Sequence, residues 1–158
     1  MGGSSLKTFT ALALDNFPLI KSRDNLAKII VEVARKSGLK IEDGDVIAIA
    51  QKIFSKAEKR VIRLKEVVAS KKAEEIAETT GKSPKFVELV LGETKNIVKV
   101  SCETLLVEDK RGLVCINAGI DKSNVEGEGN FALLPEDPDE SAEECRMEIK
   151  KQTGKNVG

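Results

Sequence analysis

The sequence predicts an α+β fold in which helices pack on a mixed or antiparallel sheet. Several segments carry apolar residues at the spacing of an amphipathic helix, and capping residues precede them. Short apolar runs bounded by turn residues indicate strands. These helices and strands are interleaved without the strict alternation of βαβ units, and this pattern favours α+β over a regular parallel sheet.

The N-terminal part predicts strand, helix and strand in turn. Residues 8–14 alternate loosely and indicate a first strand, and the apolar run 46–50 is typical of a buried strand. Between them Ser22 or Asp24 caps a helix, and Gly38 ends it. The apolar positions of this helix are Leu26, Ile29, Ile30, Val33 and Ala34.

The central part predicts a pair of capped helices. Ser70 begins the first of them, and Gly81 ends it. The pair Ser83-Pro84 begins the second helix, because proline suits the first helical position, and Gly92 ends it.

Strands and a last helix complete the chain. The strands are expected at residues 97–100, 104–107 and 113–116. Residues 109–112 form a turn of hairpin type, and the apolar character of 113–116 indicates a buried strand. Ser141 and Glu144 have the spacing of a capping box at the start of the last helix, which Gly154 ends.

Composition restricts the classes of partner and of chemistry. The 26 lysines and arginines balance the 26 aspartates and glutamates, so no net field favours nucleic acid or an anionic membrane, and we expect neither partner. The chain has no histidine, which excludes Ser-His-Asp and Cys-His catalysis and imidazole metal ligands. Its 3 cysteines lack CxxC spacing, and we expect a reducing, cytoplasmic location.

A polar loop follows the last predicted strand, over residues 117–126. Loops at strand ends hold polar groups out toward ligands. Asp121 offers the hard oxygen that Mg²⁺ or Mn²⁺ prefers, and Asn117 and Asn124 offer amides that donate and accept. The alternative is a turn in which these side chains only cap their own backbone.

Two further segments carry groups suited to a phosphate ligand. In residues 51–58, Lys52 and Lys56 can meet phosphate as point charges. In residues 18–21, extended backbone can line a nucleotide while Lys21 reaches a phosphate. The alternatives are a solvated basic face and an ordinary strand-to-helix connection. Neither a GxxxxGK[ST] nor a GxGxxG pattern is present in these segments.

Taken in this order and at these separations, the three segments resemble the coenzyme F420-0:L-glutamate ligases, the F420 gamma-glutamyl ligase family. The most specific string is Asn-Ala-Gly-Ile-Asp-Lys-Ser-Asn-Val-Glu over residues 117–126, and the likeness runs from about Phe9 to the end. The resemblance implies a gamma-glutamyl ligase-like domain over residues 7–158, and residues 1–6 are expected to be a flexible leader or an expression remnant.

The resemblance also implies a reaction and a set of site residues. GTP would phosphorylate the lactyl carboxylate of coenzyme F420-0, and L-glutamate would then displace phosphate from the acyl phosphate to form a gamma-linked amide. Asp121 would bind Mg²⁺ or Mn²⁺, and the protein would be a homodimer. The residues that would contact GTP are Pro18, Leu19, Ile20, Lys21, Gln51, Lys52, Lys56 and Asn124.

The chain departs from the family's pattern in one respect. The family has an Asp-Thr pair in a later strand that completes the metal site, and this sequence does not contain that strand. We therefore expect a fold that is incomplete at the C-terminus, the N-terminal part of a ligase, with at most weak ligase activity on its own. The rival expectation is a non-catalytic nucleotide-binding or assembly domain, and a plain α+β domain that uses the loop only as a turn is the third.

Overall fold

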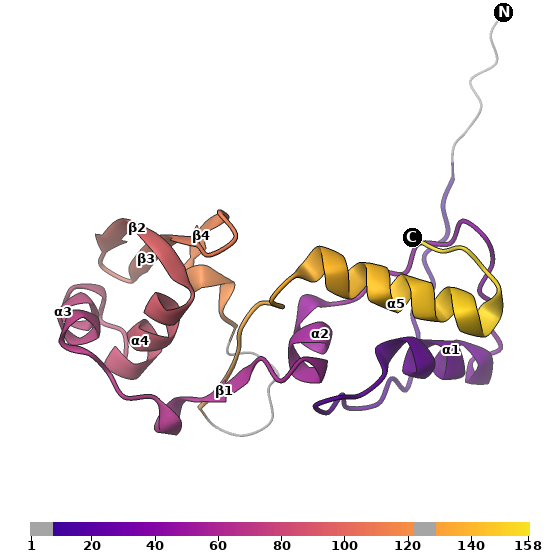
Figure 1. The fold of residues 1–158 in the computed structure, drawn as a ribbon, viewed down its shortest axis with the longest axis horizontal. Helices are drawn as coiled ribbons and strands as arrows, with labels where there is room; N and C mark the ends of the chain where they lie inside the picture. The colour runs from indigo at the N-terminus through magenta and orange to yellow at the C-terminus, as the bar shows by residue number, and fades with distance from the viewer. Residues whose placement is uncertain (1–7, 122–128) are drawn as a thin grey trace, which may run out of the picture. The chain divides into compact units, whose positions relative to one another are not determined.

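The computed structural model describes residues 8–121 and 129–158, so the predicted leader at 1–6 lies outside the described residues. Contacts divide the chain into two compact units (Figure 1). The first unit holds residues 1–19, 25–47 and 143–158, and the second holds 20–24 and 48–142. Each unit is described by itself below.

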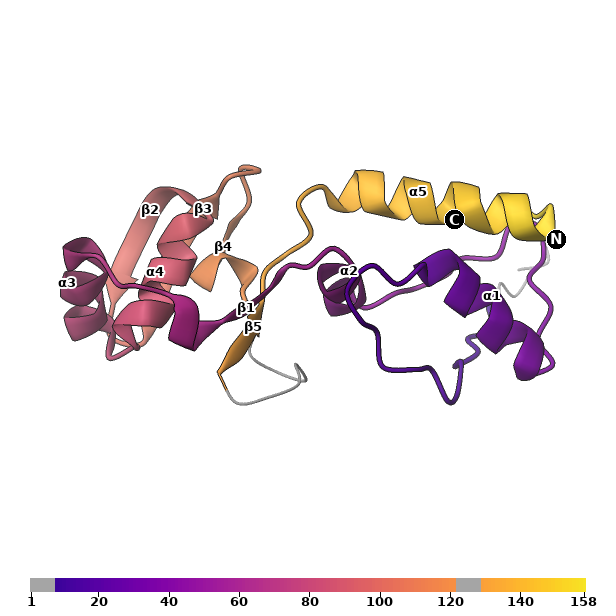
Figure 2. The ribbon, with the colours of Figure 1, turned by 60° about the horizontal axis from the view of Figure 1, so that its bottom comes forward.

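The first unit is built on α1 (Leu26–Lys36) and on the greater part of α5 (Pro138–Thr153). Figure 1 and Figure 2 both show α1 lying alongside α5, and the buried side chains include Ile30 and Ile149. The predicted helix is therefore confirmed, but its cap is not Ser22 or Asp24. Asn25 caps α1 by accepting a 2.9 Å hydrogen bond from the backbone N–H of Lys28.

Neither strand expected in the N-terminal part forms. Residues 8–14 have no strand, and Phe9 is 92% exposed. Near the second expected strand, Ile47 donates to the carbonyl of Gly158 and Gly158 donates to the carbonyl of Asp45, both at 2.8 Å. Within the described residues, this backbone pairing does not extend through 48–50. That segment therefore lacks the neighbouring strand with which a β-strand forms hydrogen bonds.

The larger sheet of the second unit is antiparallel, which confirms the predicted fold class. Its strands are β2 (Thr94–Ser101), β3 (Thr104–Asp109) and β4 (Val114–Ile116), in the order β2-β3-β4. Figure 2 shows α3 (Lys71–Thr80) and α4 (Pro84–Gly92) against one face of the β2–β3 pair. The buried apolar residues between these layers are Ala73, Ile76, Ala77, Val87, Val90, Leu105 and Val107.

The predicted signals for α3 and α4 are confirmed. Ser70 Oγ accepts a 3.3 Å hydrogen bond from the N–H of Ala73, and Gly81 ends α3 in the left-handed conformation. Pro84 stands in the first turn of α4. The capping box expected at Ser141 is wrong, because α5 begins earlier, at Pro138. There Asp137 Oδ1 accepts hydrogen bonds from the backbone N–H groups of Asp139 and Glu140.

β4 forms where a strand was expected, but it is not buried. Among the described strands it pairs only with β3 and so lies at the edge of the sheet, and Leu113, Val114 and Ile116 are exposed. An apolar run identifies a strand, but it does not show how many neighbours cover that strand.

A second, two-stranded sheet joins β1 (Val61–Arg63) to β5 (Asn130–Ala132) in antiparallel register. α2 (Gln51–Ala57), a helix within the segment noted above only as polar and basic, contacts β5. Phe131 on β5 is buried, and its ring centre lies 5.0 Å from that of Phe86 on α4. None of the helices in the described part has the length and apolar character needed to cross a membrane.

Gly119 allows a direct test of this packing. It has φ +67°, and a Cβ there would lie 2.7 Å from Leu134 Cδ1, whereas Gly81 has φ +68° and open space around it. Both Gly→Ala changes incur the left-handed penalty of about 1–2 kcal/mol. We expect Gly119→Ala to lower the free energy of unfolding by about 1 kcal/mol more than Gly81→Ala, measured in urea. Equal losses would contradict the contact.

Asp109 allows a test by pH. Burial raises the pKa of its carboxyl, but hydrogen bonds from the Arg111 side chain and from the N–H groups of Leu113 and Arg111 outweigh burial and lower the pKa. This contribution to stability is complete above the unfolded pKa of about 4 and is lost as pH falls through the lowered folded pKa.

Asp109→Asn should therefore lower the free energy of unfolding by about 3 kcal/mol at pH 7, because it leaves Arg111 without its charged partner. It should also weaken the acid-side dependence of stability, measured by urea unfolding from pH 2 to pH 7. Asp15→Asn, an exposed control, should change neither. An unchanged acid limb in Asp109→Asn would refute this assignment.

Candidate functional site

Asp121 is fixed to the second unit through its backbone. Its N–H donates to the carbonyl of Ala132 at 3.0 Å, and its carbonyl accepts from the N–H of Ala132 at 2.9 Å, which makes an antiparallel bridge next to β5. Its side chain is 37% exposed. The carboxylate therefore stands on anchored backbone, as a ligand-binding group requires.

The turn that leads to Asp121 is strained. Asn117, Ala118 and Gly119 have φ values of +53°, +52° and +67°, and only the last of them is a glycine. A non-glycine residue in this region is uncommon, and such strain concentrates at functional sites. Within the described part of the chain, Asn117 Oδ1 is buried and has no hydrogen-bond partner.

Among the described residues, Lys52 forms an ion pair with Asp121. Its Nζ lies 2.9 Å from Asp121 Oδ2. Lys52 stands in the first turn of α2, and its neighbour Gln51 anchors that turn, because Gln51 Nε2 donates to the carbonyl of Leu133 and to Ser55 Oγ. Ser55 is fully buried and its hydroxyl also donates to the carbonyl of Gln51. The predicted residues Gln51, Lys52 and Asp121 thus meet at one place.

Lys56 and Lys21 lie in two segments whose backbones are joined by a hydrogen bond. Lys56 is in the last turn of α2. The loop 20–24 contacts the same helix end, because the N–H of Arg23 donates to the carbonyl of Ala57 at 2.8 Å. Asp24 holds this loop by accepting from the N–H of Lys21 at 2.7 Å. Across 8–121 and 129–158, neither lysine forms an ion pair with Asp121.

The remaining predicted contacts are divided. Ile20 is buried in the second unit, whereas Pro18 and Leu19 belong to the first, and Leu19 is exposed. Asn124 lies outside the described residues. Sequence reasoning did not identify the pairing of Lys52 with Asp121, since their separation in sequence gives no sign of the contact.

The described residues do not form a complete metal site by themselves. No group of three or more cysteine, aspartate or glutamate side chains among them is placed to hold a metal ion. Asp121 presents a single carboxylate to this position, with a lysine beside it. Such a set fits Mg²⁺ only where substrate phosphates supply most of the other oxygens, which is a common arrangement for that ion.

The chain is similar to proteins of one known family. The family model described as F420-0:Gamma-glutamyl ligase matches residues 15–158. Among curated relatives, proteins called Coenzyme F420:L-glutamate ligase are 40% identical in Methanothermobacter thermautotrophicus, 44% in Methanocaldococcus jannaschii and 46% in Archaeoglobus fulgidus. These matches cover 92%, 89% and 92% of this chain, and 58%, 54% and 55% of the relatives.

The chain therefore spans a little over half the length of these relatives. The family match covers both units described above, and includes Lys52, Asp121 and the strained turn that precedes Asp121. The chain belongs to the F420-0:gamma-glutamyl ligase family.

Proposed function

We propose that this chain supplies the nucleotide- and metal-binding part of a GTP-dependent ligase that joins L-glutamate to coenzyme F420-0 through a gamma-linked amide. Family membership and the names of the relatives support the class of reaction. The single observation that carries the assignment is the anchored carboxylate of Asp121 with Lys52 Nζ 2.9 Å away. One anion and one cation at the same place suit a metal–triphosphate complex.

The proposed chemistry has two steps. The lactyl carboxylate attacks the γ-phosphorus of GTP, which forms an acyl phosphate and releases GDP. The amine of L-glutamate then attacks the acyl carbon, phosphate leaves, the amine's proton passes to solvent or a base, and the amide remains. Both steps rely on positioning and on neutralising phosphate charge, which lysines and a carboxylate-held metal can do without histidine.

In this proposal each predicted residue has a role. Lys52, Lys56 and Lys21 neutralise phosphate oxygens, and Asn124 contacts the nucleotide. Gln51 orients the first turn of α2, and Ile20 lines the nucleotide, whereas contacts of Pro18 and Leu19 with it remain predictions. Asp121 would hold Mg²⁺ or Mn²⁺, which supplies Lewis-acid polarisation of the transferred phosphoryl group. The homodimer and the cytoplasmic location remain predictions.

A second candidate is a non-catalytic nucleotide-binding or assembly domain of the same family. The observation that favours it is that no group of three or more acidic or cysteine side chains among the described residues is placed to hold a metal ion. Such a domain would bind the nucleotide through the same lysines and would not turn it over.

Nucleotide binding tests both candidates. We expect calorimetry to detect GTP binding in the presence of Mn²⁺, and Asp121→Asn to weaken it at least about tenfold while changing metal-free binding less. The control Glu78→Gln removes one exposed carboxylate from α3 and should bind like the unaltered chain. If Asp121→Asn and Glu78→Gln bound GTP equally well in the presence of Mn²⁺, this would contradict a role of Asp121 in metal binding.

Product analysis then separates the two candidates. With GTP, Mn²⁺, coenzyme F420-0 and L-glutamate, slow formation of the glutamylated product by the purified chain supports the ligase. Binding of GTP without any product supports the binding domain. Absence of GTP binding at millimolar concentration would overturn both.

Asp121→Asn should remain folded, which makes the test interpretable. The ion pair with Lys52 is partly exposed, with side-chain exposures of 27% and 37%, and pairs of this kind contribute about 1 kcal/mol or less. We expect loss of this ion pair to change the free energy of unfolding in urea by no more than about 1 kcal/mol. A loss of several kcal/mol would mean that Asp121 has a structural role instead.

A further inference from the structure

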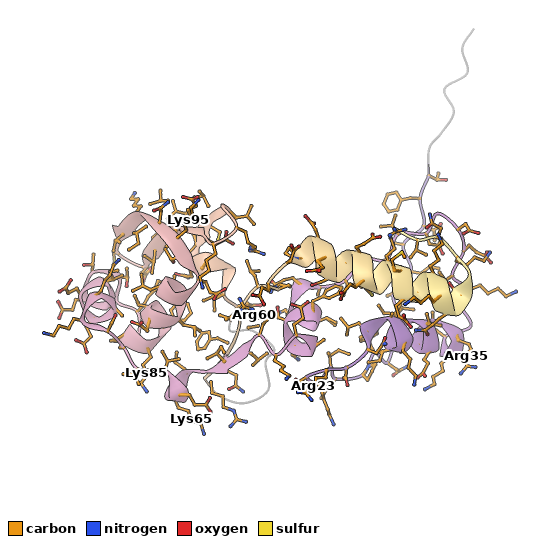
Figure 3. All side chains as sticks on the ribbon, in the orientation of Figure 1. Arg23, Arg35, Arg60, Lys65, Lys85 and Lys95 are labelled. Atoms are coloured by element: carbon orange, nitrogen blue, oxygen red, sulfur yellow. The ribbon has the colours of Figure 1, made fainter. Side chains whose placement is uncertain are left out.

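A polar cavity lies in the second unit, and the proposed nucleotide site does not use it. It has a volume of about 290 Å³, close to the lower limit of small-molecule sites. We call it the charged cavity. Its charged lining residues are Arg60, Glu93, Asp109, Lys110, Arg111 and Glu136. Figure 3 labels Arg60, which stands between α2 and β1.

Four of these six groups pair with one another and form the frame of the cavity. Asp109 accepts four hydrogen bonds, three of them from Arg111, so its carboxylate is saturated. Arg60 Nη2 donates to Glu93 Oε2, and Arg60 Nε donates to the carbonyl of Leu134 at 3.0 Å. A guanidinium has five N–H donors, so Arg60 keeps donors for a ligand.

The other two groups have hydrogen-bonding capacity to spare, and they are opposite in charge. Lys110 Nζ lies 3.7 Å from Glu93 Oε1, too far for a hydrogen bond, and its side chain is 64% exposed. Glu136 is exposed, and its carboxylate makes no hydrogen bond or ion pair with any described residue. A ligand that carries both a carboxylate and an ammonium group satisfies both.

We propose that the charged cavity binds the amine donor of the ligation, an amino acid with a second carboxylate, as in L-glutamate. This inference rests on the proposed function. Lys110 binds the α-carboxylate, Glu136 accepts from the ammonium group, and the free N–H donors of Arg60 meet the side-chain carboxylate. The lining holds three acids and three bases, and this balance disfavours a dianion such as inorganic phosphate.

The position of the cavity agrees with this role. Ala118 contributes to its lining and is three residues before Asp121, so their Cα atoms are at most about 11 Å apart. Leu134, which also lines the cavity, is two residues after Ala132, which pairs with Asp121. The backbone that lines the cavity is therefore continuous with the backbone that carries Asp121, as adjacent sites for the two substrates require.

Titration of the purified chain with L-glutamate, followed by calorimetry and by NMR shifts of the backbone amides, tests the proposal. We expect saturable binding that Lys110→Met and Glu136→Gln each weaken at least about tenfold. The matched control is Lys95→Met, because Lys95 is also exposed and pairs with a glutamate on the same sheet, outside the cavity. It should bind L-glutamate like the unaltered chain.

A second probe identifies which end of the ligand each residue holds. Glutarate has both carboxylates and lacks the ammonium group, so Lys110→Met should weaken its binding while Glu136→Gln should not. Absence of saturable L-glutamate binding, or equal affinities in all three variants, would overturn the proposal. Equal weakening of glutarate by both cavity variants would overturn the assigned orientation and with it the site.

The titration contains no nucleotide, metal or coenzyme F420-0, so its failure is distinct from failure of the proposed function. GTP binding without L-glutamate binding would remove the cavity assignment alone. L-glutamate binding without GTP binding would remove the nucleotide site and leave the cavity as an amino-acid site.

Discussion

The antiparallel pairing of β5 is the interaction on which the functional part of the second unit depends. β5 pairs with β1 on one side, and Ala132 at its end pairs with Asp121. The next residues continue this role, because the N–H of Leu133 donates to the carbonyl of Arg60 at 2.9 Å and its carbonyl accepts from Gln51. A three-residue strand thus holds α2, the start of β1 and the site carboxylate in one arrangement.

The same segment relates the two proposed binding sites. Asp121 and Lys52 lie at the end of β5, and two residues further on Leu134 lines the charged cavity and accepts from Arg60. The burial of Phe131 and Ala132 keeps this strand in the core, so neither site depends on exposed backbone alone. The net charge of zero does not reveal this local arrangement, in which one acid and one base meet at Asp121 and Lys52, and three acids and three bases line the charged cavity.

Local signals in the sequence predicted the elements that depend on local chemistry. The Ser70 cap, the proline in the first turn of α4 and the left-handed Gly81 follow from backbone geometry within a few residues. The expected strands at 8–14 and 46–50 failed because a strand exists only beside a partner, and sequence alone does not name that partner. The start of α5 was misplaced because Asp137 competes with Ser141 as a cap.

The candidate site was predictable only where the signal lies within one short segment of the sequence. The order and polarity of 18–21, 51–58 and 117–126 selected these segments as candidates, and the resemblance supplied their expected roles. The contact between Lys52 and Asp121 was not predictable, since it arises from α2 packing on β5. The charged cavity was also not predictable, because its residues come from the end of β3 and from segments before β1, before β2, after β4 and after β5, and they share no sequence pattern.

The Lys52–Asp121 ion pair has a consequence for how such a site admits its ligands. An unpaired carboxylate at this position would repel an approaching phosphate group. The carboxylate of Asp121 is paired with the ammonium group of Lys52, and the pair has no net charge. Because the pair is partly exposed, separating it costs about 1 kcal/mol or less, which is at most about a fivefold penalty on binding. In the proposed site, the ammonium group of Lys52 would then meet a phosphate oxygen and the carboxylate of Asp121 a cation. If the proposed metal–triphosphate complex binds here, reversing either charge leaves one half of it without a counterpart, so the opposite signs at these two positions matter more than the strength of the pair.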